Sequence, residues 1–121
     1  MIISFAKTTP ALLNGSKTVT RRGWCDTHAA KFHKGDIVDA YDKSPRYRGK
    51  KVATIRITKD PYKQALSDMP DDHFEREGGL QLWPRGIAEF QLMMGSMDKI
   101  YWVVEFELVY RVCCPVDGGG V

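Results

Sequence analysis

Apolar and polar residues alternate in two stretches of the chain, at residues 52–58 and 100–112. In the first stretch Ala53, Ile55 and Ile57 form an apolar set, separated by more polar neighbours. Successive side chains of a β-strand point to opposite faces, so this alternation predicts two strands that each bury one face. Shorter stretches rich in apolar or β-branched residues predict three further strands, at residues 1–5, 18–22 and 37–41.

Helices are predicted between these strands by start and stop signals. Thr9-Pro10 is typical of a helix start, with threonine as the cap, and Asn14-Gly15 is typical of its end. Residues 63–94 carry a helical pattern, with one short helix between Asp71 and Gly78-Gly79 and another over Ile87–Met94. Residues 23–34 and 43–51 are predicted to be loops. Strands with short intervening helices predict one α+β domain built on a small β-barrel.

The size and composition of the chain fit this expectation. Its 121 residues are 43% hydrophobic and 27% charged. A chain of this length and composition can form one hydrophobic core and is too short for two. The domain is predicted over residues 1–112, followed by a flexible, glycine-rich tail over residues 113–121. No apolar run approaches the roughly 20 residues that span a bilayer, and three cysteines form no disulfide or metal-binding pattern. We therefore expect a cytoplasmic protein without membrane partners.

Charge is distributed unevenly along the chain. Residues 1–60 contain 13 lysines and arginines against 5 acidic residues, whereas residues 61–121 contain 5 against 10. The basic half indicates a polyanion or an anionic substrate as partner, although charge asymmetry alone is weak support because exposed faces are often one-signed.

Candidate chemistry is concentrated in residues 15–22, Gly-Ser-Lys-Thr-Val-Thr-Arg-Arg. The amine of Lys17 can accept a proton if burial or a neighbouring cation lowers its pKa. The Thr20 hydroxyl becomes a nucleophile once a base acts on it, and arginine binds phosphate, carboxylate or carbonyl oxygens. The alternative interpretation is a solvated basic strand. In a regular strand Lys17 and Thr20 would point to opposite faces, so they can meet only if the chain turns after Gly15.

The spacing of Gly15, Lys17 and Arg22 resembles the Gly-x-Lys-x-x-x-x-Arg signature of the ASCH family. The resemblance extends to further elements of that family in the same order, at residues 3–5 with 11–15, residues 32–38 and residues 100–106. The resemblance implies a small PUA-like β-barrel with short flanking helices. The segment from His73 to Glu77 is similar to the corresponding region of the acetylcytidine amidohydrolases of this family.

The resemblance also implies an activity and a set of site residues. Lys17 would be the proton acceptor, Thr20 the nucleophile and Glu77 the proton donor in hydrolysis of the acyl amide of a modified pyrimidine nucleoside, such as N4-acetylcytidine. Arg22, or a backbone amide, would stabilise the oxyanion. The adjacent Arg21 and Trp24 complete the expected substrate-binding residues, although Trp24 and Trp83 are also ordinary core residues. We expect no cofactor and no metal, because the histidines and Cys25 lack a zinc spacing.

A second hypothesis arises from the basic loop at residues 43–51. An RNA-binding PUA-like module would recognise a base in the same cleft, with Lys17 and Arg22 binding phosphate, and a ribonuclease of the ASCH type would use that cleft to cleave RNA. In either case the loop would contact phosphates of single-stranded RNA and stack a base. The alternative interpretation is a solvated turn. The candidate nucleic-acid-binding residues are Arg46, Tyr47, Arg48, Lys50 and Lys51.

Overall fold

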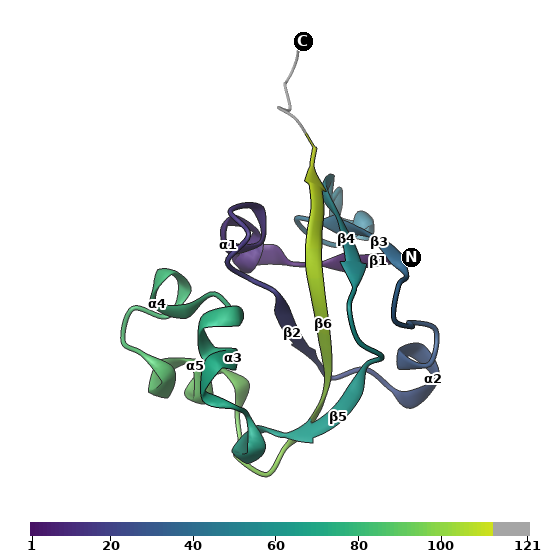
Figure 1. The fold of residues 1–121 in the computed structure, drawn as a ribbon. Helices are drawn as coiled ribbons and strands as arrows, with labels where there is room; N and C mark the ends of the chain where they lie inside the picture. The colour runs from purple at the N-terminus through teal and green to yellow at the C-terminus, as the bar shows by residue number, and fades with distance from the viewer. Residues whose placement is uncertain (113–121) are drawn as a thin grey trace.

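The structure is a computed structural model that describes residues 1–112, and Figure 1 shows it as a ribbon. Six β-strands form its frame: β1 (Ile2–Ser4), β2 (Val19–Arg22), β3 (Ile37–Tyr41), β4 (Lys51–Ile57), β5 (Tyr62–Ala65) and β6 (Ile100–Arg111). Five short α-helices lie between them: α1 (Thr9–Leu13), α2 (Asp26–Ala29), α3 (Asp71–Arg76), α4 (Gly79–Leu82) and α5 (Ile87–Met94). Three 3-10 turns complete the elements: η1 (Ala6–Thr8), η2 (Pro45–Tyr47) and η3 (Leu66–Asp68).

The strands form a sheet that is curled into a half-barrel around the long strand β6. The order across the sheet is β1-β3-β4-β6-β2, with β1 parallel to β3 and the other neighbours antiparallel. β5 also pairs with β6, on the side opposite β2, so β4 and β5 follow one another along the same side of β6. β1 and β2 are therefore the two end strands of the curled sheet.

Two groups of apolar side chains stabilise the fold. The larger one fills the concave side of the sheet with residues from β1, α1, β3, β4 and β6, among them Phe5, Leu12, Ile55 and Phe106. The smaller one holds the helical segment together: Leu66, Phe74, Trp83 and Phe90. Figure 1 shows α3, α4 and α5 gathered beside β2, away from the β3–β4 hairpin. The helical segment is thus a separate layer placed next to the end strand of the sheet.

The α+β class and the predicted strands are confirmed by the structure. The alternation in β4 has the expected result, because Ala53, Ile55 and Ile57 are fully buried. β5 is a correction: its residues 63–65 lie within the segment predicted to carry a helical pattern, but they pair with β6. The short helix α2 lies within the predicted loop 23–34. Both elements are only four residues long, too short for a periodic pattern to reveal them.

The first helix begins slightly earlier than the sequence suggests. Thr9 is its first residue rather than its cap, and the Thr9 hydroxyl donates to the carbonyl of Ala6. The helix ends as predicted: Asn14 is the C-cap, and Gly15 has a φ of +84°, a conformation that glycine adopts without strain. The predicted flexible tail, with Cys113 and Cys114, lies outside the described residues.

No helix within residues 1–112 combines the length and the apolar character that crossing a membrane requires.

Candidate functional site

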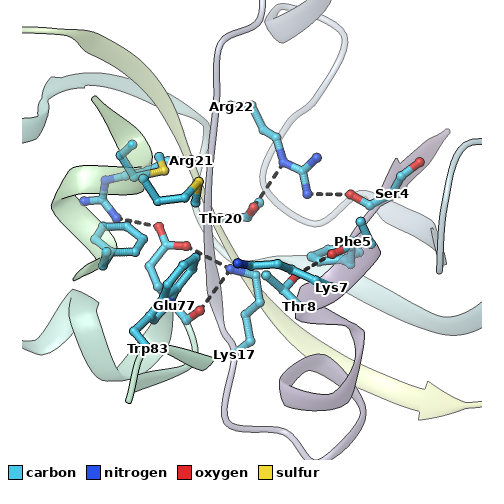
Figure 2. Close-up of a pocket in the computed structure, with 14 residues that line it drawn as sticks. Ser4, Phe5, Lys7, Thr8, Lys17, Thr20, Arg21, Arg22, Glu77 and Trp83 are labelled. Atoms are coloured by element: carbon cyan, nitrogen blue, oxygen red, sulfur yellow. Dashed lines mark hydrogen bonds and ion pairs between the residues drawn. The ribbon is translucent and has the colours of Figure 1, made fainter. Parts of the chain in front are cut away.

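A cavity of about 320 Å³ opens where the end strand β2 meets the turn after β1 and the helical layer. Lys17, Thr20, Arg21, Arg22 and Glu77 line its polar side. Figure 2 shows these side chains converging from β2, from the segment before it and from the end of α3. Five of the candidate residues that the sequence singles out therefore meet at one place, although Glu77 is 60 residues from Lys17 in the chain.

Lys17 is held in place by the segment that joins α1 to β2. This segment follows the left-handed Gly15 and is not yet part of the strand, as the glycine had indicated. The backbone amide of Lys17 donates to the carbonyl of Ala11 at 3.0 Å, and that of Thr18 donates to the carbonyl of Arg76 at 2.8 Å. These two bonds fix the segment to α1 on one side and to the end of α3 on the other.

Glu77 is positioned by the end of α3. It is the C-cap residue of that helix, and its amide donates to the carbonyl of His73 at 2.8 Å. Gly78 follows with a φ of +122°, and a Cβ there would lie 2.3 Å from Cδ1 of Leu82. Only glycine fits this turn, which ends the helix and leaves the Glu77 carboxylate facing Lys17. Although it stands at the end of a helix, Glu77 is only 4% exposed, so it is not a solvated surface acid.

Lys17, Glu77 and Arg21 form a buried ionic network. Nζ of Lys17 donates to Oε1 of Glu77 at 2.8 Å, to the carbonyl of Val19 at 2.8 Å and to the carbonyl of Glu77 at 3.4 Å. Nη1 of Arg21 donates to Oε2 of Glu77 at 2.8 Å. The side chains of all three residues are at most 5% exposed. One carboxylate therefore serves two buried cations.

Both Nη atoms of Arg21 are bonded to protein groups, while its buried Nε has no hydrogen-bond partner among residues 1–112. Besides Glu77, its Nη2 donates to Oε1 of Gln64 at 2.7 Å and to Nδ1 of His73 at 2.8 Å. Its side chain is 0% exposed. This is a different role from the substrate binding expected for Arg21: it holds Glu77 in position. Sequence reasoning missed Gln64 and His73 in this network, and no spacing or motif in the sequence links them to Arg21.

Thr20 and Arg22 form the second polar pair of the cavity. Nε of Arg22 donates to Oγ1 of Thr20 at 3.1 Å, and Nη2 of Arg22 donates to the carbonyl of Ser4 at 2.6 Å. Arg22 therefore connects the two end strands β2 and β1 across the open side of the half-barrel (Figure 2). Thr20 is 3% exposed, and its hydroxyl accepts a bond from a cation, which leaves the hydroxyl proton free to be donated.

The free side of β2 explains how residues from both faces of this strand, and Lys17 just before it, line the same cavity. Arg21 pairs with Val103 of β6, and Thr20 pairs with Val104, so these two side chains leave β2 on opposite faces. β2 has a strand on one side only, and the cavity opens along its free side, where residues of both faces line it. Thr20 bonds to Arg22 and not to Lys17, whose ammonium donates to Glu77 and to the carbonyl of Val19.

Burial is the largest influence on the protonation of this network. It lowers the pKa of Lys17 from its ordinary value of 10.5, and Arg22 and Arg21 lower it further, while Glu77 opposes the shift. Burial likewise lowers the pKa of His73, with Arg21 and Arg76 adding to the effect. A neutral His73 can accept the bond from Arg21 at Nδ1, which places its proton on Nε2.

The remaining wall of the cavity is apolar. Phe5 contributes from the end of β1, while Trp83, Phe90, Met93 and Met94 contribute from the helical layer. The ammonium of Lys7 lies 4.4 Å from the centre of the Trp83 ring, a cation–π contact. The cavity therefore combines a cationic side with an aromatic and aliphatic side, an arrangement common in binding sites for small molecules.

Trp24 does not line this cavity. Its ring stacks on Phe32 at 4.7 Å between centroids with an interplanar angle of 17°, and it also contacts His28. It packs against the larger apolar core, which is the alternative role considered for it. Trp83, the other tryptophan considered, is the one that lies at the cavity.

The basic loop is also separate from the cavity, because none of its residues lines it. Arg46, Tyr47, Arg48 and Lys50 are exposed, with 67% of Tyr47 accessible. Lys51 belongs to β4 instead, where its Nζ lies 3.1 Å from Oδ1 of Asp39. Within residues 1–112 no group of three or more histidine, cysteine or acidic side chains is arranged to hold a metal ion.

Comparison with known proteins shows a likeness to a solved structure. A crystal structure of protein EF3133 from Enterococcus faecalis V583, described under family model DUF984, superposes with a TM-score of 0.62 at 17% sequence identity. The match covers 93% of this chain and 76% of the other. No protein-family model and no curated protein matches the sequence. The likeness supports the fold, and at this identity it carries no statement about activity.

Proposed function

We propose that this protein is an amidohydrolase of the ASCH type, which removes the acyl group from the exocyclic amine of a modified pyrimidine nucleoside such as N4-acetylcytidine. One observation carries the proposal: a lysine with a lowered pKa, a carboxylate 2.8 Å from it and a threonine hydroxyl line one cavity. These are the base, acid and nucleophile that amide hydrolysis needs.

The Lys17–Glu77 hydrogen bond supplies both the base and the acid. Transfer of one proton along this 2.8 Å bond turns an ammonium and a carboxylate into a neutral amine and a carboxylic acid. The neutral amine of Lys17 can then accept the proton of Thr20, while Glu77 holds a proton for the leaving group. Burial lowers the pKa of Lys17 and so favours its neutral amine, while the ion pair with Glu77 opposes this shift.

The covalent steps follow from the positions of Thr20 and Arg22. The Thr20 oxygen attacks the acyl carbon and forms a tetrahedral intermediate, while Lys17 takes the hydroxyl proton. Arg22 already donates to the Thr20 oxygen at 3.1 Å and has further N–H groups with which to stabilise the oxyanion. Glu77 protonates the departing amine of the base, and water then releases the acyl group from Thr20. Lys17 must turn from its present acceptors towards Thr20 for the first step.

The apolar wall suits the other part of such a substrate. A pyrimidine ring is flat and polarisable, and Trp83, Phe5 and Phe90 offer aromatic surfaces for it beside the polar groups. A volume of about 320 Å³ is at the lower end of the range of small-molecule pockets, which run from roughly 300 to 1,000 Å³. These features support a substrate of about the size of one nucleoside.

The proposal is tested by incubating the purified protein with N4-acetylcytidine and, separately, with short single-stranded RNA, and analysing both by mass spectrometry. We expect cytidine and acetate from the first incubation and intact RNA from the second. Cleavage of the RNA with no release of acetate would contradict the amidohydrolase assignment and favour a ribonuclease.

RNA binding by the basic loop is a second candidate function, supported by the exposure of Arg46, Tyr47, Arg48 and Lys50. If both arginines contact phosphates, substitution of Arg46 and Arg48 by alanine will flatten the dependence of log K on log salt by about one to two units, because each contact releases roughly 0.7 counterion on single strands. Fluorescence anisotropy at several salt concentrations measures this slope. An unchanged slope excludes both arginines as phosphate contacts.

A further inference from the structure

The side chains that line the cavity carry an excess of positive charge. Lys7, Lys17, Arg21 and Arg22 are its cations, and Glu77 is the only acid among the described residues that line it. The Lys17–Glu77 pair has no net charge whichever of the two holds the shared proton. Because Arg21 shares Glu77 with Lys17, four cations face one acid, and the lining keeps three positive charges in excess. Uncompensated charges in a partly dry site are unfavourable, and a bound anion relieves them.

Arg22 shows this lack of compensation most clearly. Both of its hydrogen bonds are to uncharged oxygens, those of Thr20 and Ser4. Burial lowers its pKa, and Glu77, which Lys17 and Arg21 already share, is the group that offsets this. Three of its five N–H groups have no partner among residues 1–112. The oxyanion of the transition state in amide hydrolysis would neutralise one of the three excess positive charges of the cavity. Two would remain without a counter-charge.

Lys7 is the most accessible cation of the cavity and lies at its edge. It belongs to the 3-10 turn η1, is exposed, and forms no ion pair with any acid of residues 1–112. Its ammonium lies instead over the ring of Trp83. The preceding Ala6 has a φ of +45°, in the left-handed region that costs a non-glycine residue about 1–2 kcal/mol. The turn thus accepts backbone strain at the position that directs Lys7 towards the cavity.

We propose that the substrate carries an anionic group in addition to its amide, and that Lys7 binds this group, so that the preferred substrate is an acylated pyrimidine nucleotide with a 5′-phosphate. This inference rests on the proposed function for the identity of the base and the acyl group. Phosphate carries close to two negative charges at neutral pH and accepts several hydrogen bonds, which matches the charge left uncompensated here. The base would lie between the apolar wall and the polar groups, with the phosphate at the edge.

Binding of the reaction products tests the inference without requiring turnover. Isothermal titration calorimetry at low salt compares cytidine with cytidine 5′-monophosphate, using the wild-type protein, Lys7→Gln and the control Lys31→Gln. Lys31 is also exposed but does not line the cavity. We expect the wild type and Lys31→Gln to bind the monophosphate about 10- to 100-fold more tightly than cytidine, as a hydrogen bond between charged groups implies. Lys7→Gln is expected to lose most of this preference.

The outcomes separate this inference from the proposed function. Equal affinity for cytidine and its monophosphate, no binding of the monophosphate, or a preference that survives Lys7→Gln would overturn the inference. A preference for N4-succinylcytidine over N4-acetylcytidine, without one for the 5′-phosphate, would also overturn it, because the anion would then belong to the acyl group. Hydrolysis of N4-acetylcytidine with equal affinities would leave the amidohydrolase assignment standing alone. A Lys7-dependent preference without hydrolysis of either compound would contradict that assignment and support the anion site.

Discussion

Replacing Glu77 by glutamine is expected to lower the free energy of unfolding by about 3–5 kcal/mol, the cost typical of breaking a buried ion pair from one side. The substitution keeps the shape of the side chain but removes the charge that Lys17 and Arg21 share at 2.8 Å each. Two cations are then buried without an acid. Natural domains have a total stability of roughly 5–15 kcal/mol, so the variant is expected to be close to unfolding.

Urea denaturation at neutral pH measures this effect, and Glu107→Gln is the matched control. Glu107 also pairs with an arginine, Arg56, at 2.6 Å, but both side chains are about half exposed. The control is expected to change stability by no more than about 1 kcal/mol, as surface pairs do. The double variant Lys17→Met, Glu77→Gln removes one of the two unpaired cations and is expected to recover part of the loss. A loss in Glu77→Gln no larger than in Glu107→Gln would contradict the network described here.

A large loss of catalysis is expected from a substitution at Lys17 that keeps its positive charge. Arginine at this position remains protonated at all accessible pH values, so it can pair with Glu77 but cannot accept the proton of Thr20. We expect Lys17→Arg to lower kcat/KM for the acylated substrate by about 10²–10⁴-fold, the contribution typical of a general base. Lys17→Met is expected to lose as much, and comparison of the two variants separates the role of the base from that of the charge.

The pH profile of the wild type provides the control for this interpretation. The active form holds one proton, shared by Lys17 and Glu77, so kcat/KM should fall at high pH when the pair loses this proton to solvent. Because burial lowers the pKa of Lys17, this fall is expected below pH 10.5. Lys17→Arg should lose the fall, provided that circular dichroism shows it to be folded. Activity in Lys17→Arg with an unchanged profile would exclude Lys17 as the base.

Much of the fold could be predicted from the sequence because burial and local backbone chemistry agree along most of the chain. The alternation of Ala53, Ile55 and Ile57 reflects one buried face, and Gly15 ends a helix where only a left-handed residue fits. β5 could not be predicted in this way, because its four residues are half-buried or exposed and depend on β6 for their conformation. Pairing with a strand distant in the sequence determines such an element, and the pattern of hydrophobic and polar residues does not reveal it.

The site was predictable only in part, for a similar reason. Lys17, Thr20 and Arg22 lie within one short motif, and the resemblance to a known family extended the set to Glu77. The contacts of Arg21 with Gln64 and His73 depend on how β2, β5 and α3 are arranged in space. Trp24 and Trp83 could not be separated in the sequence, since both are aromatic residues in irregular segments. Only the placement of the helical layer brings Trp83 to the cavity.

The most direct measurement of the central claim is the release of acetate from N4-acetylcytidine by the wild type, Thr20→Ser, Thr20→Ala and the control Thr54→Ala. Thr54 is a buried threonine of β4 that does not line the cavity. The account predicts activity in the wild type and Thr54→Ala, reduced but measurable activity in Thr20→Ser, and none in Thr20→Ala. Equal rates for the wild type and Thr20→Ala would contradict a threonine nucleophile and, with it, the mechanism proposed for this cavity.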